Sequence, residues 1–145
     1  MKKVLMMAFV AATMLMATGC SKDDQKVFSG DSLKGTTWVG KLNVTETQTE
    51  DDIEMTMTIN STVTIKFLTE STGQLIATGT MTSTVMGQTF TEEIDEDPVN
   101  FTYTFDGTTV RAINEDDDVV EMHLNSAKTA LVLNEDGHSI SLYLQ

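Results

Sequence analysis

Residues 53–67 read IEMTMTINSTVTIKF, and the apolar side chains of this stretch fall on odd-numbered positions, with only Ser61 breaking the series. Successive side chains of a β-strand point to opposite faces, so an apolar residue at every second position predicts a strand with one buried face. The parity is kept across Asn60-Ser61, which favours one long strand of roughly 15 residues. A hairpin that turns at Asn60-Ser61 is the alternative.

The same period of two continues on both sides of this stretch. Trp38, Gly40, Leu42 and Val44 share one face, and further alternating runs surround Leu75, Phe101, Val110, Met122, Leu131 and Ile140. Asp97-Pro98 interrupts the pattern because proline cannot donate to a strand ladder, and Asp106-Gly107 is typical of a hairpin. The chain is therefore predicted to be all-β, a small antiparallel up-and-down barrel of about eight to ten strands, with a flattened sandwich as the alternative.

The first twenty residues have the layout of an export signal. Lys2 and Lys3 precede an apolar run from Val4 to about Met16, and small residues lead to Cys20, the single cysteine of the chain. The run is shorter than the roughly 20 apolar residues of a membrane-spanning helix. This arrangement resembles the lipoprotein signal family, which implies cleavage after Gly19 and a diacylglyceryl group with an added N-acyl chain on Cys20. An ordinary signal peptide with an unrelated cysteine is the alternative.

A short charged motif follows the cysteine. Lys22, Asp23 and Asp24 resemble the export signal of surface lipoproteins in Bacteroidetes-type bacteria. That resemblance implies an outer-membrane protein, anchored by its lipid and exposed at the cell surface. Several acyl chains on one cysteine hold a protein firmly, whereas a single chain gives marginal binding.

Three segments are expected: a cleaved leader at 1–19, a lipidated cysteine with a polar tether at 20–32, and a barrel domain at 33–145. Cleavage would remove two of the nine basic side chains and move the formal net charge from −13 to −15. Such a surface repels a phosphate backbone, so nucleic acid is not an expected partner. With Cys20 acylated, no thiol remains for a disulfide, a thiolate metal site or a cysteine nucleophile.

The start of the barrel domain has one recognisable element. Gly35 and Trp38 open the first expected strand, and this opening resembles lipocalin-like proteins, in which a tryptophan closes one end of the barrel. The resemblance implies a small up-and-down barrel. Trp38 is equally consistent with an ordinary core aromatic.

No catalytic or cofactor motif is present. His123 falls on the face opposite Met122, and His138 lies in a turn beside Ser139, so neither is expected to form a nucleophilic pair. Three acidic runs at 50–52, 92–97 and 115–118 lack the alternate spacing and central glycine of a calcium loop. We expect no enzyme activity, no metal and no cofactor.

Two functions remain open. The first is a non-catalytic barrel that binds a small apolar or amphipathic ligand, with small residues leaving room inside and a lining drawn from Met55, Met57, Met81, Phe101, Tyr103 and Met122. The second is a structural or interaction lipoprotein that presents a filled barrel and an acidic surface to an envelope protein. If Phe67, Phe101, Tyr103 and Phe105 point inward together, the cavity largely disappears and the second function is favoured.

The lipoprotein interpretation depends on Cys20 alone. Replacing it (Cys20→Ala) should release the protein from the membrane fraction, because no other residue can receive the acyl chains. Fractionation of cells followed by immunoblotting measures the distribution. Recovery of the variant in the membrane pellet would show that another feature holds the chain there.

Overall fold

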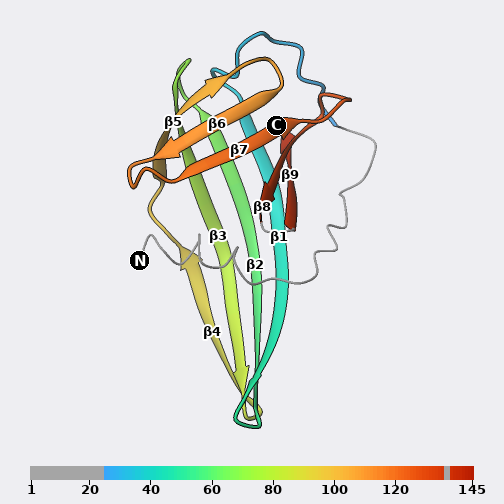
Figure 1. Ribbon diagram of the computed structural model, residues 1–145, viewed down its shortest axis with the longest axis vertical. Coiled ribbons are helices and arrows are strands. Elements are labelled where there is room, and N and C mark those ends of the chain that lie inside the picture. Colours follow the sequence, from blue (N-terminus) through green and yellow to red (C-terminus); the bar gives the residue numbers. More distant parts are fainter. Residues whose placement is uncertain (1–24, 136–137) are drawn as a thin grey trace.

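A computed structural model of the chain describes residues 25–135 and 138–145, and within them it contains nine β-strands (Figure 1). The strands are β1 (Thr37–Glu50), β2 (Ile53–Phe67), β3 (Thr72–Val85), β4 (Gln88–Asp95), β5 (Val99–Phe105), β6 (Thr109–Asn114), β7 (Val119–Leu124), β8 (Ala130–Glu135) and β9 (His138–Leu144). In this part of the chain, no helix has the length and hydropathy to cross a membrane. The leader, Cys20 and the Lys22-Asp23-Asp24 motif lie outside the described residues.

Eight of the strands form a closed antiparallel barrel. The sheet runs in the order β2-β1-β9-β8-β7-β6-β5-β3-β4, and an additional pairing of β2 with β3 closes it, which leaves β4 as an extra strand beside β3. The predicted all-β up-and-down barrel is therefore confirmed. β2 is continuous through Asn60-Ser61, where Asn60 pairs with Asn43 and Thr80, so the single long strand is correct and the hairpin alternative is wrong.

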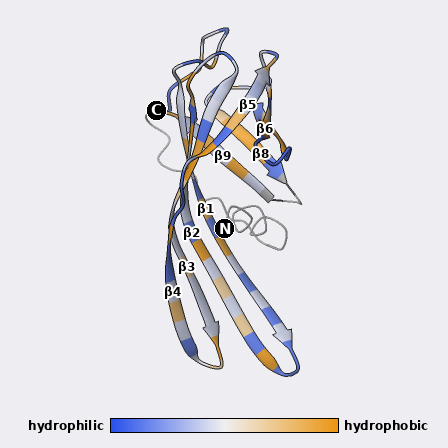
Figure 2. Cartoon of the chain, turned by 90° about the vertical axis from the view of Figure 1, so that its left-hand side faces the viewer, coloured by the Kyte–Doolittle hydropathy of each residue, from blue (hydrophilic) through white to orange (hydrophobic). Residues whose placement is uncertain are grey.

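The first three strands are about twice as long as the last five. β1, β2 and β3 have 14, 15 and 14 residues, whereas β5 to β9 have six or seven each. β3 pairs with β5 only over Thr72–Leu75 and then pairs with β4 over Thr78–Val85. Residues 44–60 and 79–95 consequently leave the barrel as a four-stranded sheet in the order β1-β2-β3-β4, which we call the extension (Figures 1 and 2).

Two tight turns close the far end of the extension. Asp51 and Asp52 connect β1 to β2 with φ of 49° and 63°, and Met86 and Gly87 connect β3 to β4 with φ of 51° and 78°. Two-residue hairpin loops in which both residues have positive φ match the right-handed twist of the strands that they join. These turns therefore keep β1 and β2, and β3 and β4, in register to the tip.

The barrel interior follows the predicted parity. The largest fully buried side chains come from six of the eight barrel strands and from the segment before β1: Trp38, Phe67, Leu33, Ile65, Met122, Leu131, Leu142 and Val110. The outward positions of the long strands are rich in threonine. On the extension, these threonines form cross-strand hydroxyl pairs at 3.0 to 3.3 Å, namely Thr45 with Thr58, Thr47 with Thr56, Thr82 with Thr91 and Thr84 with Thr89.

The barrel core begins earlier in the chain than Leu33. Phe28 lies within the segment expected to be a polar tether, yet it is 5% exposed and its ring stands 6.0 Å from the rings of Trp38 and Phe105. Its N–H donates to the carbonyl of Lys128 at 2.7 Å. An isolated apolar residue gives no periodic signal, so only the folded barrel identifies Phe28 as a core residue.

The alternation of faces can be tested at two neighbouring positions of β5. Phe101 is 8% exposed and packs among aromatic rings, whereas Thr102 is exposed on the outer wall. Phe101→Ala should lower the free energy of unfolding by about 3–5 kcal/mol, and Thr102→Ala should change it by less than about 0.5 kcal/mol. Urea unfolding of residues 21–145 measures both, and equal effects would contradict the face assignment.

Candidate functional site

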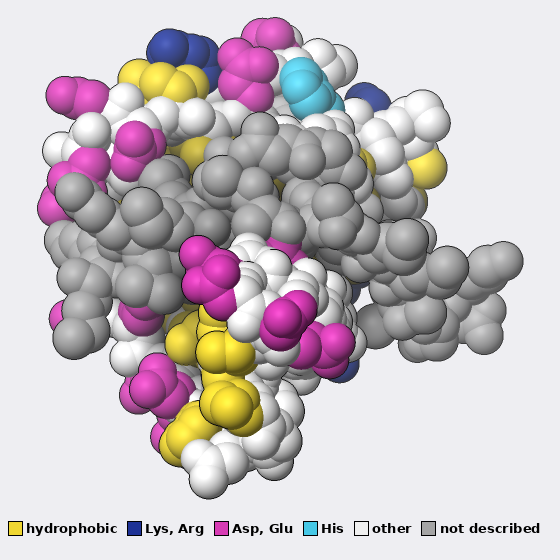
Figure 3. Space-filling model, turned by 60° about the horizontal axis from the view of Figure 1, so that its bottom comes forward, with side chains coloured by type: hydrophobic (Ala, Val, Ile, Leu, Met, Phe, Trp, Pro, Cys, Tyr) yellow, Lys and Arg dark blue, Asp and Glu magenta, His cyan; other side chains and the backbone are white. Residues whose placement is uncertain are grey.

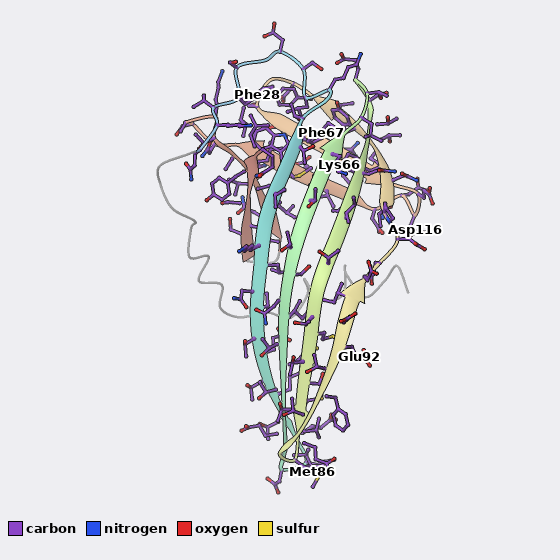
Figure 4. The ribbon with its side chains drawn as sticks, turned by 180° about the vertical axis from the view of Figure 1, so that it is seen from behind. Phe28, Lys66, Phe67, Met86, Glu92 and Asp116 are labelled. Atoms are coloured by element: carbon purple, nitrogen blue, oxygen red, sulfur yellow. The ribbon has the colours of Figure 1, made fainter. Side chains whose placement is uncertain are left out.

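The end of the barrel where the chain enters is filled with aromatic side chains. The rings of Phe67 and Tyr103 are 4.8 Å apart, and Phe101 stands 6.0 Å from Phe67 and 6.2 Å from Tyr103, all in edge-on geometry. Phe105, partly buried, packs against the same core. Figure 4 shows Phe67 and Phe28 together at this end of the molecule. The four aromatic residues that decide between an empty and a filled barrel therefore all contribute to one packed cluster.

Trp38 is buried completely beneath the entering chain. Its indole N–H donates to the Thr36 hydroxyl at 2.9 Å, and Phe28 covers its ring. Gly35, with φ of 77°, turns the chain so that its N–H donates to the carbonyl of Phe67 at 2.7 Å. Both residues of the opening motif thus help to close this end of the barrel, and Trp38 also serves as a core residue.

Gly40 and Gly73 do not leave free space along the barrel wall. A Cβ added at Gly40 would meet the Ser141 carbonyl oxygen at 2.6 Å and a Leu142 methyl at 2.7 Å. A Cβ added at Gly73 would lie 2.3 Å from the Phe101 ring. At these two positions the glycine admits a neighbouring strand or ring, so the missing side chain does not create a cavity.

The residues expected to line a ligand site are divided between two places. Phe101, Tyr103 and Met122 are 8, 5 and 2% exposed and belong to the barrel core. Met55, Met57 and Met81 lie on the extension, where Met55 is 44% exposed. The structure does not bring these six residues into one site.

The extension has two unlike faces. The outer face carries the threonine pairs, whereas the inner face continues the inward positions of the barrel wall past its rim. The apolar residues of the two middle strands line this inner face: Ile53, Met55, Met57, Ile59, Met81 and Val85. Phe90 and Ile94 of β4 are added at one edge, because they pair with Ser83 and Gly79. Figure 3, with the tip turned forward, shows hydrophobic side chains gathered there beside acidic ones.

Carboxylates stand at both edges of this inner face. Glu46 of β1 pairs with Met57, and Glu92 of β4 pairs with Met81, so each acid shares a row with a methionine. Glu46 is only 9% exposed, and its Oε1 is buried without a hydrogen-bond partner. Sequence reasoning missed Glu46. The available signal was an acidic residue at an inward position of an alternating strand, two residues after Val44.

The acidic turns and histidines form no further site in the described residues. Asn114 organises the turn that follows β6, because its Oδ1 accepts from the N–H groups of Asp116 and Asp118 at 2.9 Å each. His123 lies on the outer wall, with its Nδ1 3.1 Å from the Thr109 hydroxyl. Within residues 25–135 and 138–145, no three histidine, cysteine, aspartate or glutamate side chains are grouped to hold a metal ion.

Comparisons of the chain with protein-family models, with curated proteins and with solved structures gave no match. The fold and the two faces of the extension therefore define the protein as a closed β-barrel with a four-stranded extension.

Tyr103 anchors the aromatic cluster through its hydroxyl group, which donates to the Thr69 carbonyl at 2.6 Å. Burial raises the pKa of this hydroxyl above its ordinary value of 10.0, and the negative charge of Glu70 raises it further. A raised pKa in the folded state means that the stabilisation is complete below about pH 10 and is lost as the pH rises through the folded value.

Tyr103→Phe should therefore lower the free energy of unfolding by about 1 kcal/mol at pH 7, and the difference from the parent should narrow above about pH 10. Urea unfolding between pH 7 and pH 11 measures this. Tyr143→Phe is the control, since the hydroxyl group of Tyr143 makes no hydrogen bond within the described residues. A Tyr103→Phe difference that stays constant across this range would contradict the explanation.

Proposed function

We propose that this chain is a non-catalytic, lipid-anchored protein of the outer membrane that acts by contacting another envelope component with its extension and acidic surface. The packed cluster of Phe67, Phe101 and Tyr103 is the observation that carries the proposal. The sequence leaves two functions open. The first, enclosure of a small apolar molecule, needs interior space at the place that this cluster occupies. The second function needs only a stable scaffold and an exposed surface.

The exposed surface lies on the extension. Ile53, Met55 and Phe90 are 42, 44 and 59% exposed, and they lie on the same face of the extension, with Val85 between Met55 and Phe90. Contiguous exposed apolar side chains rimmed by polar residues are typical of protein or membrane contact sites. The lipid on Cys20 and surface display through Lys22, Asp23 and Asp24 belong to the same proposal, and they would place the extension within reach of other surface components.

The test compares two positions by photo-crosslinking in intact cells. A photoreactive side chain at Met55, on the inner face of the extension, should give a discrete adduct, whereas one at Arg111, on the outer wall of the barrel, should give none. Native mass spectrometry of the extracted protein should show the acylated chain without a stoichiometric small molecule. Retention of one apolar molecule per chain would overturn the proposal and restore the ligand-binding function.

A further inference from the structure

We infer that the inner face of the extension binds a cationic amphipathic helix, which places its apolar side on the methionines and its basic side chains on Glu46, Glu50 and Glu92. This inference rests on the proposed function and names the chemistry of the partner. It follows from the composition of the inner face, the buried and unpaired Oε1 of Glu46, and the pairing of the middle strands.

The centre of the inner face is apolar and adaptable. Met57, Ile59 and Met81 occupy neighbouring positions of β2 and β3, and the exposed Met55 lies further towards the tip. Methionine side chains are unbranched and polarisable, so a surface made of them can fit helices of differing sequence. This centre favours an apolar partner surface.

The edges of the inner face are acidic and favour a positively charged partner. Glu46 and Glu50 lie on β1 at one edge, and Glu92 lies on β4 at the other. Residues 44–60 and 79–95 contain five and three acidic side chains and no lysine or arginine. In the part of the chain that the structure describes, none of these three glutamates makes an ion pair. A partner with cations on both sides of an apolar stripe would therefore be complementary to this face.

Glu46 is a second observation, independent of the charge pattern, that points to a partner on this face. The residue is nine-tenths buried beside Met57, and its Oε1 is buried without a hydrogen-bond partner. Burial of a charged group without a compensating partner is unfavourable. An ammonium or guanidinium group from a bound helix would supply the missing donor in a site where water no longer competes.

The pairing of the two middle strands favours a helical partner on this face. β2 is paired on both sides along the extension, by β1 and β3, and β3 is paired by β2 and β4. A chain lying on this face finds no free backbone groups to pair with, so it must satisfy its own, as an α-helix does. The strands of Glu46 and Glu92, β1 and β4, are three strand spacings apart, roughly 14 Å, which spans a helix about 10–12 Å in diameter.

The length of the face sets the length of the helix. From Ile59 to Ile53 the strand advances about 20 Å at roughly 3.3 Å per residue, which matches about 13 helical residues at 1.5 Å each. A second copy of the chain is a poorer occupant, because two such faces would oppose like charges. Addition of a strand to the edge of β4 is disfavoured by the acids Glu92, Glu93 and Asp95 along it.

The experiment uses residues 21–145 and a fluorescent 14-residue peptide that carries leucines along one helical stripe and lysines beside it. Two control peptides are a scrambled sequence of the same composition and the same helix with glutamate in place of lysine. Fluorescence anisotropy measures the dissociation constants at low and moderate salt. The helical cationic peptide should bind at least tenfold more tightly than either control.

Matched variants of the protein locate the contact. Glu92→Gln should weaken binding about three- to tenfold, whereas Glu93→Gln, its neighbour on the outer face, should leave it unchanged. Glu46→Gln should weaken binding similarly, with Glu54→Gln of the outer face as its control.

Met57→Ser should reduce affinity at low and moderate salt alike, since the contact of an apolar side chain is not screened by salt. Melting curves of all variants check that the barrel is intact.

Several outcomes would overturn the inference. The first is that Glu92→Gln and Glu93→Gln weaken peptide binding equally, and the second is that the scrambled peptide binds as tightly as the helical cationic peptide. The others are that the helical cationic peptide does not bind, and that sedimentation shows a dimer that buries the inner face. Each of these leaves the proposed function standing if native mass spectrometry still finds no enclosed ligand. Conversely, a retained small molecule would remove the proposed function even if the peptide binds.

Discussion

The unequal length of the strands is the constraint on which the rest of the structure depends. β1, β2 and β3 have 14 or 15 residues, but the strands that complete the barrel have six or seven. A barrel closes only over the length that all of its strands share, so half of each long strand must continue without an opposite wall. β4 pairs with the free part of β3 and turns this surplus into a four-stranded sheet.

The surplus length divides the molecule into a closed barrel that provides stability and an extension that offers an exposed surface. The shared length holds the aromatic cluster and the fully buried side chains, and the segment with Phe28 and Leu33 covers one end of it. Towards its tip the extension has no such cover, because a single sheet has two exposed faces. Its outer face is made compatible with water by threonine pairs, while its inner face keeps the apolar pattern of a barrel wall and exposes it at Met55 and Phe90.

Much of the architecture could be predicted from local pattern, and the misses have identifiable causes. The continuity of β2 and the break at Asp97-Pro98 follow from parity and from the chemistry of proline. Phe28 could not be recognised, since one apolar residue between polar ones has no period. Gly40 was ambiguous, because a glycine can leave space or admit a neighbour, and only the positions of Ser141 and Leu142 decide.

The sequence by itself determined which side chains share a face, because the alternation of a β-strand is a property of the local backbone. It therefore specified the all-β class, the inward residues and the acidic character of the surface. Only the tertiary structure decided which inward residues are covered, since cover comes from strands far away in the sequence. Met55 and Met122 have the same local pattern, yet Met122 faces an opposite wall and is buried, whereas Met55 lies past the rim and remains exposed.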